Sequence, residues 1–244
     1  MLNTIKKYFF KNNSSVAEKN AEDAYDLWSE TYDSQPGNLM LDLDEIVFSE
    51  LLRKINTENK IIADIGCGTG RHWKKIFDKH PKSLTGFDVS EGMLNKLKEK
   101  FPSALVKKID DNFFTKEPDN YYNIIFSTLT VAHIENLREA VFAWSRIIKN
   151  GGDIIITDFH PTLLAQGGKR TFTSNKKQFA VVNYVHSVND VKDIFQEAGF
   201  FVINEIEKRI DDSLRNYYAE QNALHIFERF KGEPVIYGLH AQKK

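Results

Sequence analysis

Three glycines at alternate positions follow a short apolar run in this chain. The segment reads Asp64-Ile-Gly66-Cys67-Gly68-Thr-Gly70, and apolar residues at helical spacing come directly after it. Glycines in this pattern let the backbone turn tightly, approach a ligand closely and present amide groups at the start of a helix. The segment therefore predicts a turn that binds part of a ligand.

An acidic residue further along the chain adds to this pattern. Asp88 ends the next strand-like segment about 20 residues after the glycines, where a carboxylate can accept hydrogen bonds from ribose hydroxyls. The dinucleotide-binding pattern G-x-G-x-x-G would require a third glycine where this chain has Arg71. The glycines read G-x-G-x-G instead, and the carboxylate of Asp64 in front of them suits a cationic amino-acid group better than a pyrophosphate. The spacing therefore favours a sulfonium cofactor over a nicotinamide cofactor.

Strand-like and helix-like segments alternate along the chain around these residues. Gly151 and Gly152 are expected to end the helix that precedes the fifth strand. The alternation predicts an α/β fold with a doubly wound, mostly parallel sheet and helices on both faces. Ligands of such sheets bind beyond the carboxyl ends of the strands, where the strand order reverses. Short apolar runs predict the strands at residues 61–65, 84–89, 105–109, 122–127, 154–159, 200–206 and 235–241.

Other elements are predicted on either side of this alternation. Apolar residues at steps of three and four, among them Tyr25, Trp28 and Tyr32, predict a helix that ends near Gly37, and a second helix follows it. Residues 171–184 are expected to form a hairpin inserted after the fifth strand. The aromatic residues between 214 and 230 indicate either a second lid or a dimer surface.

With these motifs in order, the central and C-terminal majority of the chain resembles the class I S-adenosylmethionine-dependent methyltransferases, in particular their small-molecule branch. Residues 64–70 resemble the family's first motif, and residues 86–93 resemble the second. Residues 109–112 resemble the segment beside the adenine, and residues 122–134 resemble the fourth strand with its active-site turn. The family's seven-stranded, Rossmann-like sheet implies that residues 235–241 form a last strand that runs antiparallel.

The resemblance implies which residues bind the cofactor S-adenosylmethionine. Asp88 would contact the ribose, and Asp110 or Asp111 would meet the exocyclic amine of the adenine. A structural alternative remains open, because Asp64 could cap a helix and Asp110 or Asp111 could cap a loop. The full set of expected cofactor-binding residues comprises Tyr32, Asp64, Gly66, Cys67, Gly68, Gly70, Asp88, Val89, Met93, Asp110, Asp111 and Ser127.

The resemblance also divides the chain into regions. Residues 1–58 are expected to form an N-terminal helical lid, of the kind that closes over cofactor and substrate in the family. Residues 59–244 are expected to form the Rossmann-like domain. Within it we expect an insertion at about residues 160–188 and a possible second lid at about residues 211–233.

Two histidines are candidates for a general base. His133 follows the fourth strand and His160 follows the fifth, so both are expected at the cofactor end of the sheet. Either could instead be a solvated or helix-capping histidine. The seven histidines show no H-x-x-x-H or H-E-x-x-H spacing, so no metal site is predicted. Cys67 has no adjacent histidine to activate it, which favours a packing role for its thiol.

Composition narrows the classes of function. The 244 residues carry 33 Lys and Arg against 34 Asp and Glu, so the chain lacks the basic footprint of a dedicated nucleic-acid or acidic-membrane binder. A single cysteine excludes an internal disulfide, and no apolar run of about 18 residues predicts a membrane span. Residues 1–13 lack the apolar core of a signal peptide, so a cytoplasmic location is expected. A monomer or a homodimer is expected.

The expected acceptor is a small molecule. No Asn-Pro-Pro-Tyr turn of amino-methylating nucleic-acid enzymes follows the fourth strand, and the Pro-Cys pair of pyrimidine C5 chemistry does not occur. We expect direct displacement of the methyl group by an N, O or C acceptor, with orientation as the protein's main contribution. Two alternatives stay open at this point: a nicotinamide-dependent oxidoreductase, and a non-catalytic S-adenosylmethionine-binding protein on the same fold.

Overall fold

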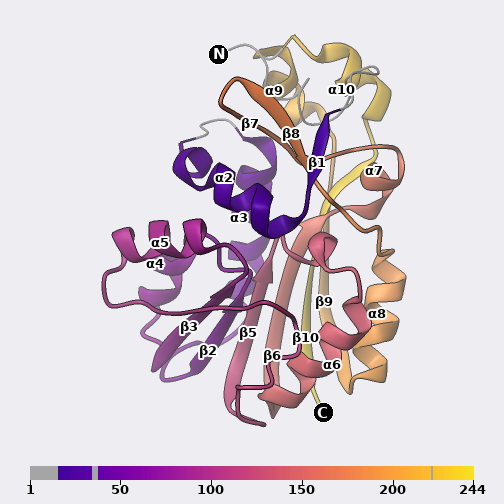
Figure 1. Ribbon diagram of the computed structural model, residues 1–244. Coiled ribbons are helices and arrows are strands. Elements are labelled where there is room, and N and C mark those ends of the chain that lie inside the picture. The colour runs from indigo at the N-terminus through magenta and orange to yellow at the C-terminus, as the bar shows by residue number, and fades with distance from the viewer. Residues whose placement is uncertain (1–15, 35–37, 221) are drawn as a thin grey trace.

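The computed structural model describes residues 16–34, 38–220 and 222–244. The expected absence of a signal peptide in residues 1–13 lies outside the described residues. The first helix, expected to end near Gly37, ends earlier, at Tyr32. Seven strands form one sheet in the order β4-β3-β2-β5-β6-β10-β9 (Figure 1). The strands are β2 (Ile61–Ile65), β3 (Ser83–Asp88), β4 (Leu105–Lys108), β5 (Tyr122–Thr128), β6 (Ile148–Phe159), β9 (Phe200–Arg209) and β10 (Pro234–Lys243).

The pairing of these strands confirms the predicted doubly wound sheet. β2 pairs in parallel with both β3 and β5, and the sheet then extends through β4 on one side and β6 on the other. β10 runs antiparallel to β6 and to β9, as expected for the last strand. The strand order therefore reverses between β2 and β5, and the crevice at their carboxyl ends is the expected ligand site.

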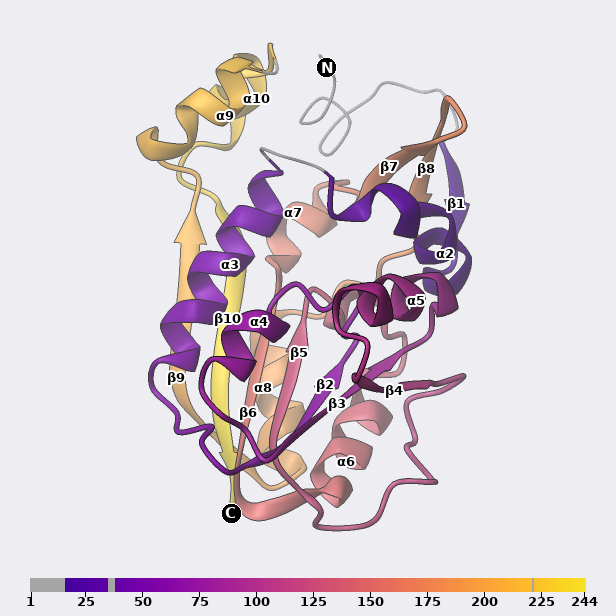
Figure 2. The ribbon, with the colours of Figure 1, turned by 90° about the vertical axis from the view of Figure 1, so that its left-hand side faces the viewer.

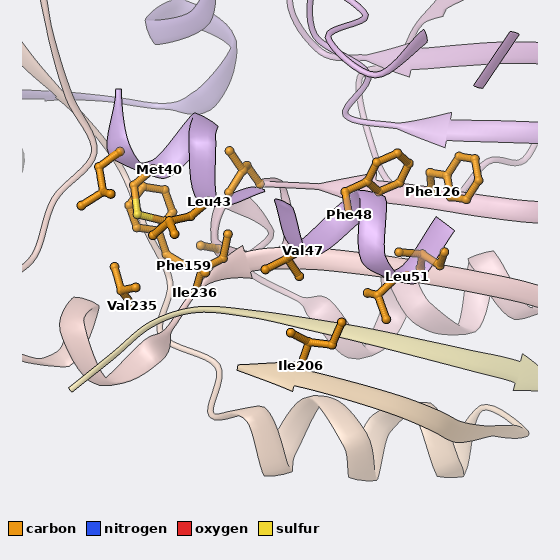
Figure 3. Close-up of a cluster of buried hydrophobic side chains, with 14 of the residues drawn as sticks. Met40, Leu43, Val47, Phe48, Leu51, Phe126, Phe159, Ile206, Val235 and Ile236 are labelled. Atoms are coloured by element: carbon orange, nitrogen blue, oxygen red, sulfur yellow. The ribbon is translucent and has the colours of Figure 1, made fainter. Parts of the chain in front are cut away.

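Helices cover both faces of this sheet (Figures 1 and 2). One apolar cluster joins the sheet to α3 (Leu39–Leu52), α4 (Trp73–Phe77) and α5 (Glu91–Lys100). A second cluster joins the opposite face to α6 (Leu137–Ile147) and α8 (Val188–Glu197). Figure 3 shows how side chains of α3 lie against side chains of the strands, and the rings of Phe48 and Phe126 meet edge to face.

Side-chain caps determine where two of these helices begin. Ser90 follows β3 almost directly, and its Oγ accepts a hydrogen bond from the amide of Met93 at 3.1 Å. Ser187 and Asp190 form a reciprocal capping box at the start of α8. Because only one residue separates Asp88 from the cap of α5, Asp88 lies at the carboxyl edge of the sheet beside a helix N-terminus.

The helix before the fifth strand ends earlier than the glycine pair predicts. α6 ends at Ile147, and Gly151 and Gly152 lie inside strand β6. The two glycines belong to an irregular stretch in which the register between β5 and β6 shifts. A Cβ atom added at Gly152 would lie 2.9 Å from the carbonyl oxygen of Asn123, so the close approach of β5 requires this glycine.

A second, three-stranded sheet belongs to the layer above the carboxyl ends of the main sheet (Figure 1). The predicted hairpin is present as β7 (Thr171–Ser174) and β8 (Lys177–Val181). Its turn residues Asn175 and Lys176 both have positive φ, as a tight two-residue hairpin turn requires. β1 (Ala17–Lys19), which the sequence did not predict, pairs in parallel with β8.

Helix α2 (Ala21–Tyr32) lies between this small sheet and α5. Its Trp28 ring stacks on Phe172 with 4.8 Å between ring centroids. On the other side, the carboxylate of Asp26 accepts hydrogen bonds from Ser90 Oγ at 2.6 Å and from the amide of Gly92 at 2.9 Å. These contacts hold α2 over the crevice.

The two helices predicted for residues 1–58 therefore have different positions. α2 lies over the crevice, whereas α3 packs on the sheet and belongs to its core. The segment predicted as a second lid contains η2 (Asp212–Leu214), α9 (Arg215–Glu220) and α10 (Leu224–Phe230), which pack on the same cluster as α3. The domain division at residue 58 and the lid function of residues 211–233 stay predictions.

Candidate functional site

A pocket opens at the carboxyl ends of β2, β3 and β5, with α2 as part of its wall. This larger pocket is lined by Ala21, Tyr25, Tyr32, Ile65, Gly66, Gly68, Asp88, Val89, Met93, Ile109, Asn112, Thr128, Leu129, Thr130, His133, Ile134 and Arg170. A smaller pocket adjoins it and is lined by Tyr32, Asp64, Gly66, Cys67, Gly68, Thr69, Arg71, His72 and Thr128. The structure thus brings most of the predicted cofactor-binding residues to one place.

The glycine turn forms the wall that the two pockets share. Gly66, Gly68 and Gly70 have φ angles of 71°, 52° and 72°, which residues with a side chain rarely adopt. A Cβ atom added at Gly66 would lie 2.1 Å from Thr130 Oγ1, and one at Gly70 would lie 3.0 Å from Leu97. At Gly68 an added Cβ atom would meet nothing within 4 Å. Packing therefore requires Gly66, whereas Gly68 leaves its backbone open to close approach by a ligand.

Asp88 closes the lower wall of the larger pocket. Its Oδ2 accepts a hydrogen bond from the amide of Gly68 at 2.8 Å, and its Oδ1 accepts one from the amide of Ser90 at 2.9 Å. Burial raises the pKa of Asp88 to about 6, although the backbone hydrogen bonds act in the opposite direction. At neutral pH the carboxylate is therefore mostly ionised, fixed in orientation and suited to accept hydrogen bonds from a pair of hydroxyls.

Asp64 and Cys67 line the smaller pocket. Asp64 Oδ2 accepts a hydrogen bond from Trp73 Nε1 at 2.7 Å, and burial raises the pKa of Asp64 to about 6. Burial also raises the pKa of the Cys67 thiol, and the neighbouring carboxylates of Asp88 and Asp64 add to this effect. A protonated, buried thiol is a poor nucleophile, which supports the packing role expected for Cys67.

A buried carboxylate of α3 holds Arg71 at the smaller pocket. Asp44 accepts hydrogen bonds from the guanidinium of Arg71, from Nε2 of His72 at 2.8 Å and from the hydroxyl of Thr157. Burial alone would raise the pKa of Asp44, but Arg71 and these hydrogen bonds hold it well below its usual range. The ionised carboxylate therefore fixes the guanidinium of Arg71 next to the glycine turn.

Apolar side chains line the larger pocket next to Asp88. Val89 and Met93 come from the strand end and the first turn of α5, and Ile109 follows β4. Asn112 adds an amide that can both donate and accept hydrogen bonds. This part of the pocket suits a flat, mostly apolar ring with polar atoms at its edge.

The two acidic residues expected at the adenine lie outside both pockets. The side chain of Asp110 is 91% exposed and lies 3.6 Å from Lys108 Nζ. Asp111 accepts a hydrogen bond from the amide of Phe113 at 2.9 Å, which is the loop-capping alternative. Asn112 of the same loop lines the larger pocket, whereas Asp110 and Asp111 line a neighbouring pocket that also includes Ile109. Contact of either carboxylate with the adenine stays a prediction.

His133 lies in the wall of the larger pocket, at the end of η1 (Val131–His133). Both ring nitrogens are engaged: Nδ1 lies 3.0 Å from the carbonyl oxygen of Val182, and Nε2 lies 2.9 Å from Tyr25 Oη. A carbonyl can only accept, so Nδ1 carries the proton and Nε2 accepts from the tyrosine hydroxyl. Burial, together with the positive charge of Arg170, lowers the pKa of His133 to about 3. The ring is neutral at physiological pH and is a weak base.

Arg170 completes the upper wall of the larger pocket. Its Nη1 donates to the carbonyl oxygen of Leu129 at 3.2 Å, and its Nη2 donates to Tyr32 Oη at 3.0 Å. Leu129 has a φ of 52°, and its amide donates to the carbonyl oxygen of Thr157 at 2.7 Å. A residue other than glycine in this conformation is strained, and such residues are concentrated at functional sites. Hydrogen bonds on both sides hold Leu129 in place.

Three further predicted residues, Gly70, His160 and Ser127, line neither pocket. His160 caps α7 (Pro161–Ala165), since its Nδ1 accepts a hydrogen bond from the amide of Thr162 at 3.3 Å. This geometry corrects the expectation that His160 faces the reacting groups. Ser127 is fully buried, and Thr128 lines the pockets instead, because successive residues of a strand point to opposite faces of the sheet.

Asn112, Arg71 and Arg170 are among the pocket residues that sequence reasoning missed. Asn112 lies within the segment expected beside the adenine, where the two neighbouring carboxylates are the stronger sequence signal. Arg71 appeared only as the residue that breaks the dinucleotide pattern. Arg170 carries no sequence signal, because it belongs to a short basic pair with Lys169 before the hairpin and matches no motif.

The residues of the two pockets fit the parts of S-adenosylmethionine. Asp88 suits the ribose hydroxyls, and Val89 with Met93 suits the adenine ring. Asp64 and Arg71 give the smaller pocket one acidic and one basic group, which suits the ammonium and carboxylate of an amino acid. Both pockets include Gly66 and Gly68, so a single elongated ligand can span them along the glycine turn.

Two negative findings hold for the described ranges 16–34, 38–220 and 222–244. No group of three or more His, Cys, Asp and Glu side chains there is placed to hold a metal ion. No helix in these ranges has the length and the apolar character needed to cross a bilayer.

Comparison with known proteins matches the central part of this chain to a known family. Residues 63–156 match a family model described as a methyltransferase domain. The matched segment runs from β2 into β6 and contains the glycine turn, Asp88 and His133.

Individual relatives and structures agree with this match. An uncharacterized methyltransferase of Emericella nidulans is 26% identical over 219 residues, which cover 74% of this chain and 76% of that protein. A malonyl-[acyl-carrier protein] O-methyltransferase of Ilyobacter polytropus is 27% identical over 169 residues. That match covers 67% of this chain and 58% of the relative, so the chain spans little more than half of the relative's length. The crystal structure of an S-adenosylmethionine dependent methyltransferase from Mesorhizobium loti shares the fold, with a TM-score of 0.62 and 15% sequence identity. The match covers 80% of this chain and 96% of that chain.

Proposed function

We propose that the chain is a class I S-adenosylmethionine-dependent methyltransferase, which transfers the methyl group of this cofactor to a nitrogen, oxygen or carbon atom of a small molecule. The observation that supports this most is the larger pocket, which lies where the strand order reverses. That pocket combines the glycine turn and Asp88 with the upper wall formed by Tyr25, His133 and Arg170.

In the proposed cofactor site, the residues already described hold different parts of the cofactor. S-adenosylmethionine supplies a methyl group that its sulfonium already activates, so the protein has mainly to orient the reactants. Asp88 would hold the ribose, and Asp64 with Arg71 would hold the amino-acid end. Such fixed positioning can lower a barrier by roughly 7 to 11 kcal/mol.

Helix α2 and the inserted hairpin are proposed to exclude water from the reaction. α2 is joined to the body of the protein by the hydrogen bonds of Asp26 and by an ion pair of 2.8 Å between Glu22 and Lys108. A closed upper layer protects the reacting atoms from solvent and keeps the acceptor in line with the methyl group.

His133 is proposed to shape the acceptor end of the pocket rather than to remove a proton. Its Nε2 lone pair is engaged by Tyr25, and its low pKa means that it holds a proton poorly. The acceptor is therefore expected to arrive without a proton at the reacting atom or to release it directly to water.

A small-molecule acceptor is supported by the nearly balanced charge of the chain and by the coverage of the pocket by α2. The Ilyobacter polytropus relative, a malonyl-[acyl-carrier protein] O-methyltransferase, also favours an acyl acceptor, which in that protein's case is carried on a protein. A cytoplasmic location and a monomeric or homodimeric state remain predictions.

The proposal is tested by binding and transfer in the same preparation. Calorimetry is expected to detect binding of S-adenosylmethionine and S-adenosylhomocysteine, and no binding of NADH. Tritium from methyl-labelled S-adenosylmethionine is then expected to enter the low-molecular-weight fraction of a metabolite extract. Asp88→Ala serves as the control and is expected to abolish the transfer.

Two outcomes would contradict the proposal in different ways. Binding of NADH without binding of S-adenosylmethionine would support the nicotinamide-dependent alternative. Binding of S-adenosylmethionine with no transfer to any acceptor in the extract would support a non-catalytic binding protein.

A further inference from the structure

The upper wall of the larger pocket holds one fixed positive charge. Arg170 is only 3% exposed, yet its side chain lines the pocket. The rings of Tyr25, Trp28 and Phe159 lie 5.4, 5.6 and 5.5 Å from its Cζ atom. Together with the hydrogen bonds to Leu129 and Tyr32, these rings fix both the position and the orientation of the guanidinium.

The distribution of charge around Arg170 separates the two ends of the pocket. Among the described lining residues, Asp88 is the acidic one, and the proposed function assigns it to the ribose. Asp158 interacts electrostatically with Arg170, but it lies behind the wall and accepts hydrogen bonds from the amides of Ala132 at 2.8 Å and Phe159 at 2.7 Å. Within the part of the chain that the structure describes, the acceptor end therefore presents a cation to the pocket and no carboxylate.

The proposed cofactor adds a second positive charge to this end. A sulfonium and a guanidinium in a pocket of low dielectric repel a protonated amine and attract an anion. The neighbouring His133 does not offset this, because Tyr25 and Val182 engage its two ring nitrogens and leave no acceptor for an ammonium proton. An acceptor with an anionic group therefore fits the wall best.

We infer that the methyl acceptor of this protein carries a carboxylate, and that Arg170 is the residue that binds it. The inference rests on the proposed function and names its substrate class. A planar guanidinium matches a carboxylate in shape and charge, and the strength of such a pair is greatest where water is excluded. The aromatic rings around Arg170 supply that exclusion and add apolar contact for the rest of the acceptor.

The inference is tested with simple probes and with the full chain saturated by S-adenosylhomocysteine. Titrations followed by ligand-observed NMR compare benzoate with benzamide and butyrate with butyramide, which differ mainly in charge. Each carboxylate is expected to bind at least tenfold more tightly than its amide. Benzylamine and butylamine are expected to bind more weakly than the amides.

Variants then assign the preference to one side chain. Arg170→Met is expected to bind each carboxylate and its amide equally, and Arg170→Lys is expected to keep part of the preference because it keeps the charge. Lys169→Met is the matched control, since Lys169 is the neighbouring cation on the same segment but is exposed and pairs with Glu18. Lys169→Met is expected to keep the full preference.

The possible results separate this inference from the proposed function. Equal binding of carboxylates and amides to the wild-type chain would overturn the inference, whatever the variants do. A preference that survives in a folded Arg170→Met variant would overturn the role of Arg170. Calorimetry of S-adenosylhomocysteine in the same samples tests the proposed function separately, and if that compound does not bind, both fall.

Discussion

Tyr25 Oη and His133 Nε2 lie 2.9 Å apart, and this hydrogen bond joins helix α2 to the turn after β5. The rings also meet edge to face, with 5.5 Å between their centroids. Because Nδ1 of the same histidine faces the carbonyl oxygen of Val182, the neutral ring links three segments of the upper layer. Protonation of His133 would break this arrangement, since Nε2 could no longer accept from Tyr25.

We predict that His133 makes the protein less stable as the pH falls from neutral. Its folded-state pKa of about 3 lies below the value of about 6.5 in the unfolded chain, so the unfolded state takes up the proton first. Between pH 6.5 and pH 5 this costs roughly 2 kcal/mol of unfolding free energy. Urea unfolding at pH 7 and pH 5 measures this loss in the wild type and in His133→Asn. The free energy of unfolding should fall more in the wild type than in the variant.

Three buried carboxyl groups make the folded state more stable as the pH falls, which opposes the effect of His133. The comparison with His133→Asn is therefore needed to separate the two effects. Burial raises the pKa of Asp64, Asp88 and Asp158 to about 6, and the folded state therefore takes up their protons first as the pH falls. Their contribution is shared by wild type and variant. If both chains show the same change between pH 7 and pH 5, His133 does not titrate as described.

We predict that Asp88→Asn weakens the binding of S-adenosylhomocysteine by roughly tenfold, which is the effect of one lost hydrogen bond to a charged group. In the wild type the affinity should also fall as the pH drops below about 6, because the pKa of Asp88 is about 6 and its protonated form accepts hydrogen bonds less well. The variant should lose the part of this pH dependence that comes from Asp88, whereas Asp64, whose pKa is also about 6, should still contribute. Calorimetric titrations at pH 5, 6 and 7 check both effects.

Asp111→Asn provides the matched control for this measurement. Asp111 is an exposed carboxylate in the segment that sequence analysis placed beside the adenine, and it accepts from the amide of Phe113 instead. Its replacement should leave the affinity unchanged, whereas Asn112→Ala should reduce it. A loss of affinity in Asp111→Asn comparable to that in Asp88→Asn would contradict the pocket described for residues 109–112.

We predict that alanine has different effects at two neighbouring glycines. Gly68→Ala places a methyl group in open pocket space, so cofactor affinity should fall strongly while the backbone strain at a φ of 52° costs roughly 1 to 2 kcal/mol. Gly66→Ala meets Thr130 as well as the same strain, so its Tm should fall further. Thermal unfolding and calorimetry of both variants check the order, and equal Tm values would contradict it.

We predict that Asp44→Asn destabilises the fold by about 3 to 5 kcal/mol, because it leaves the Arg71 guanidinium without its buried counter-charge. Urea unfolding monitored by tryptophan fluorescence measures the loss. Glu50→Gln is the control on the same helix, since Glu50 makes a partly exposed ion pair of 3.5 Å with Lys208. The control should change stability by less than about 1 kcal/mol, and a similar loss in both variants would rule out a special role for Asp44.

Much of the fold could be predicted because its signals are local. Alternating strand and helix patterns predicted the seven strands and their mostly parallel pairing, and the glycine turn with Asp88 led to a resemblance that agrees with the methyltransferase domain matched at residues 63–156. The boundary at Gly151 and Gly152 was wrong because glycines that end helices also serve bulges in strands. Strand β1 was missed because its three residues are paired only through contact with the distant β8.

From the sequence, the candidate site could be located to backbone segments but not to individual side chains. Residues 109–112 were correctly expected near the pocket, but the choice among them depends on how one loop turns its side chains, and Asn112 rather than Asp110 or Asp111 lines the pocket. In the same way, His160 follows a strand at the expected edge yet caps a helix. Position along the chain locates a backbone segment, whereas the direction of a side chain depends on its packing.

By itself, the sequence determined the doubly wound sheet, the place of the cofactor turn and the carboxylate at the next strand end, because these follow from steric preferences and side-chain periods within short segments. Tertiary structure alone decided that Asp44 holds Arg71, that Tyr25 engages His133, and that the inserted hairpin brings Arg170 into the pocket wall. Those contacts join residues far apart in the chain. The charge states that matter at the site arise from their burial, which no local pattern encodes.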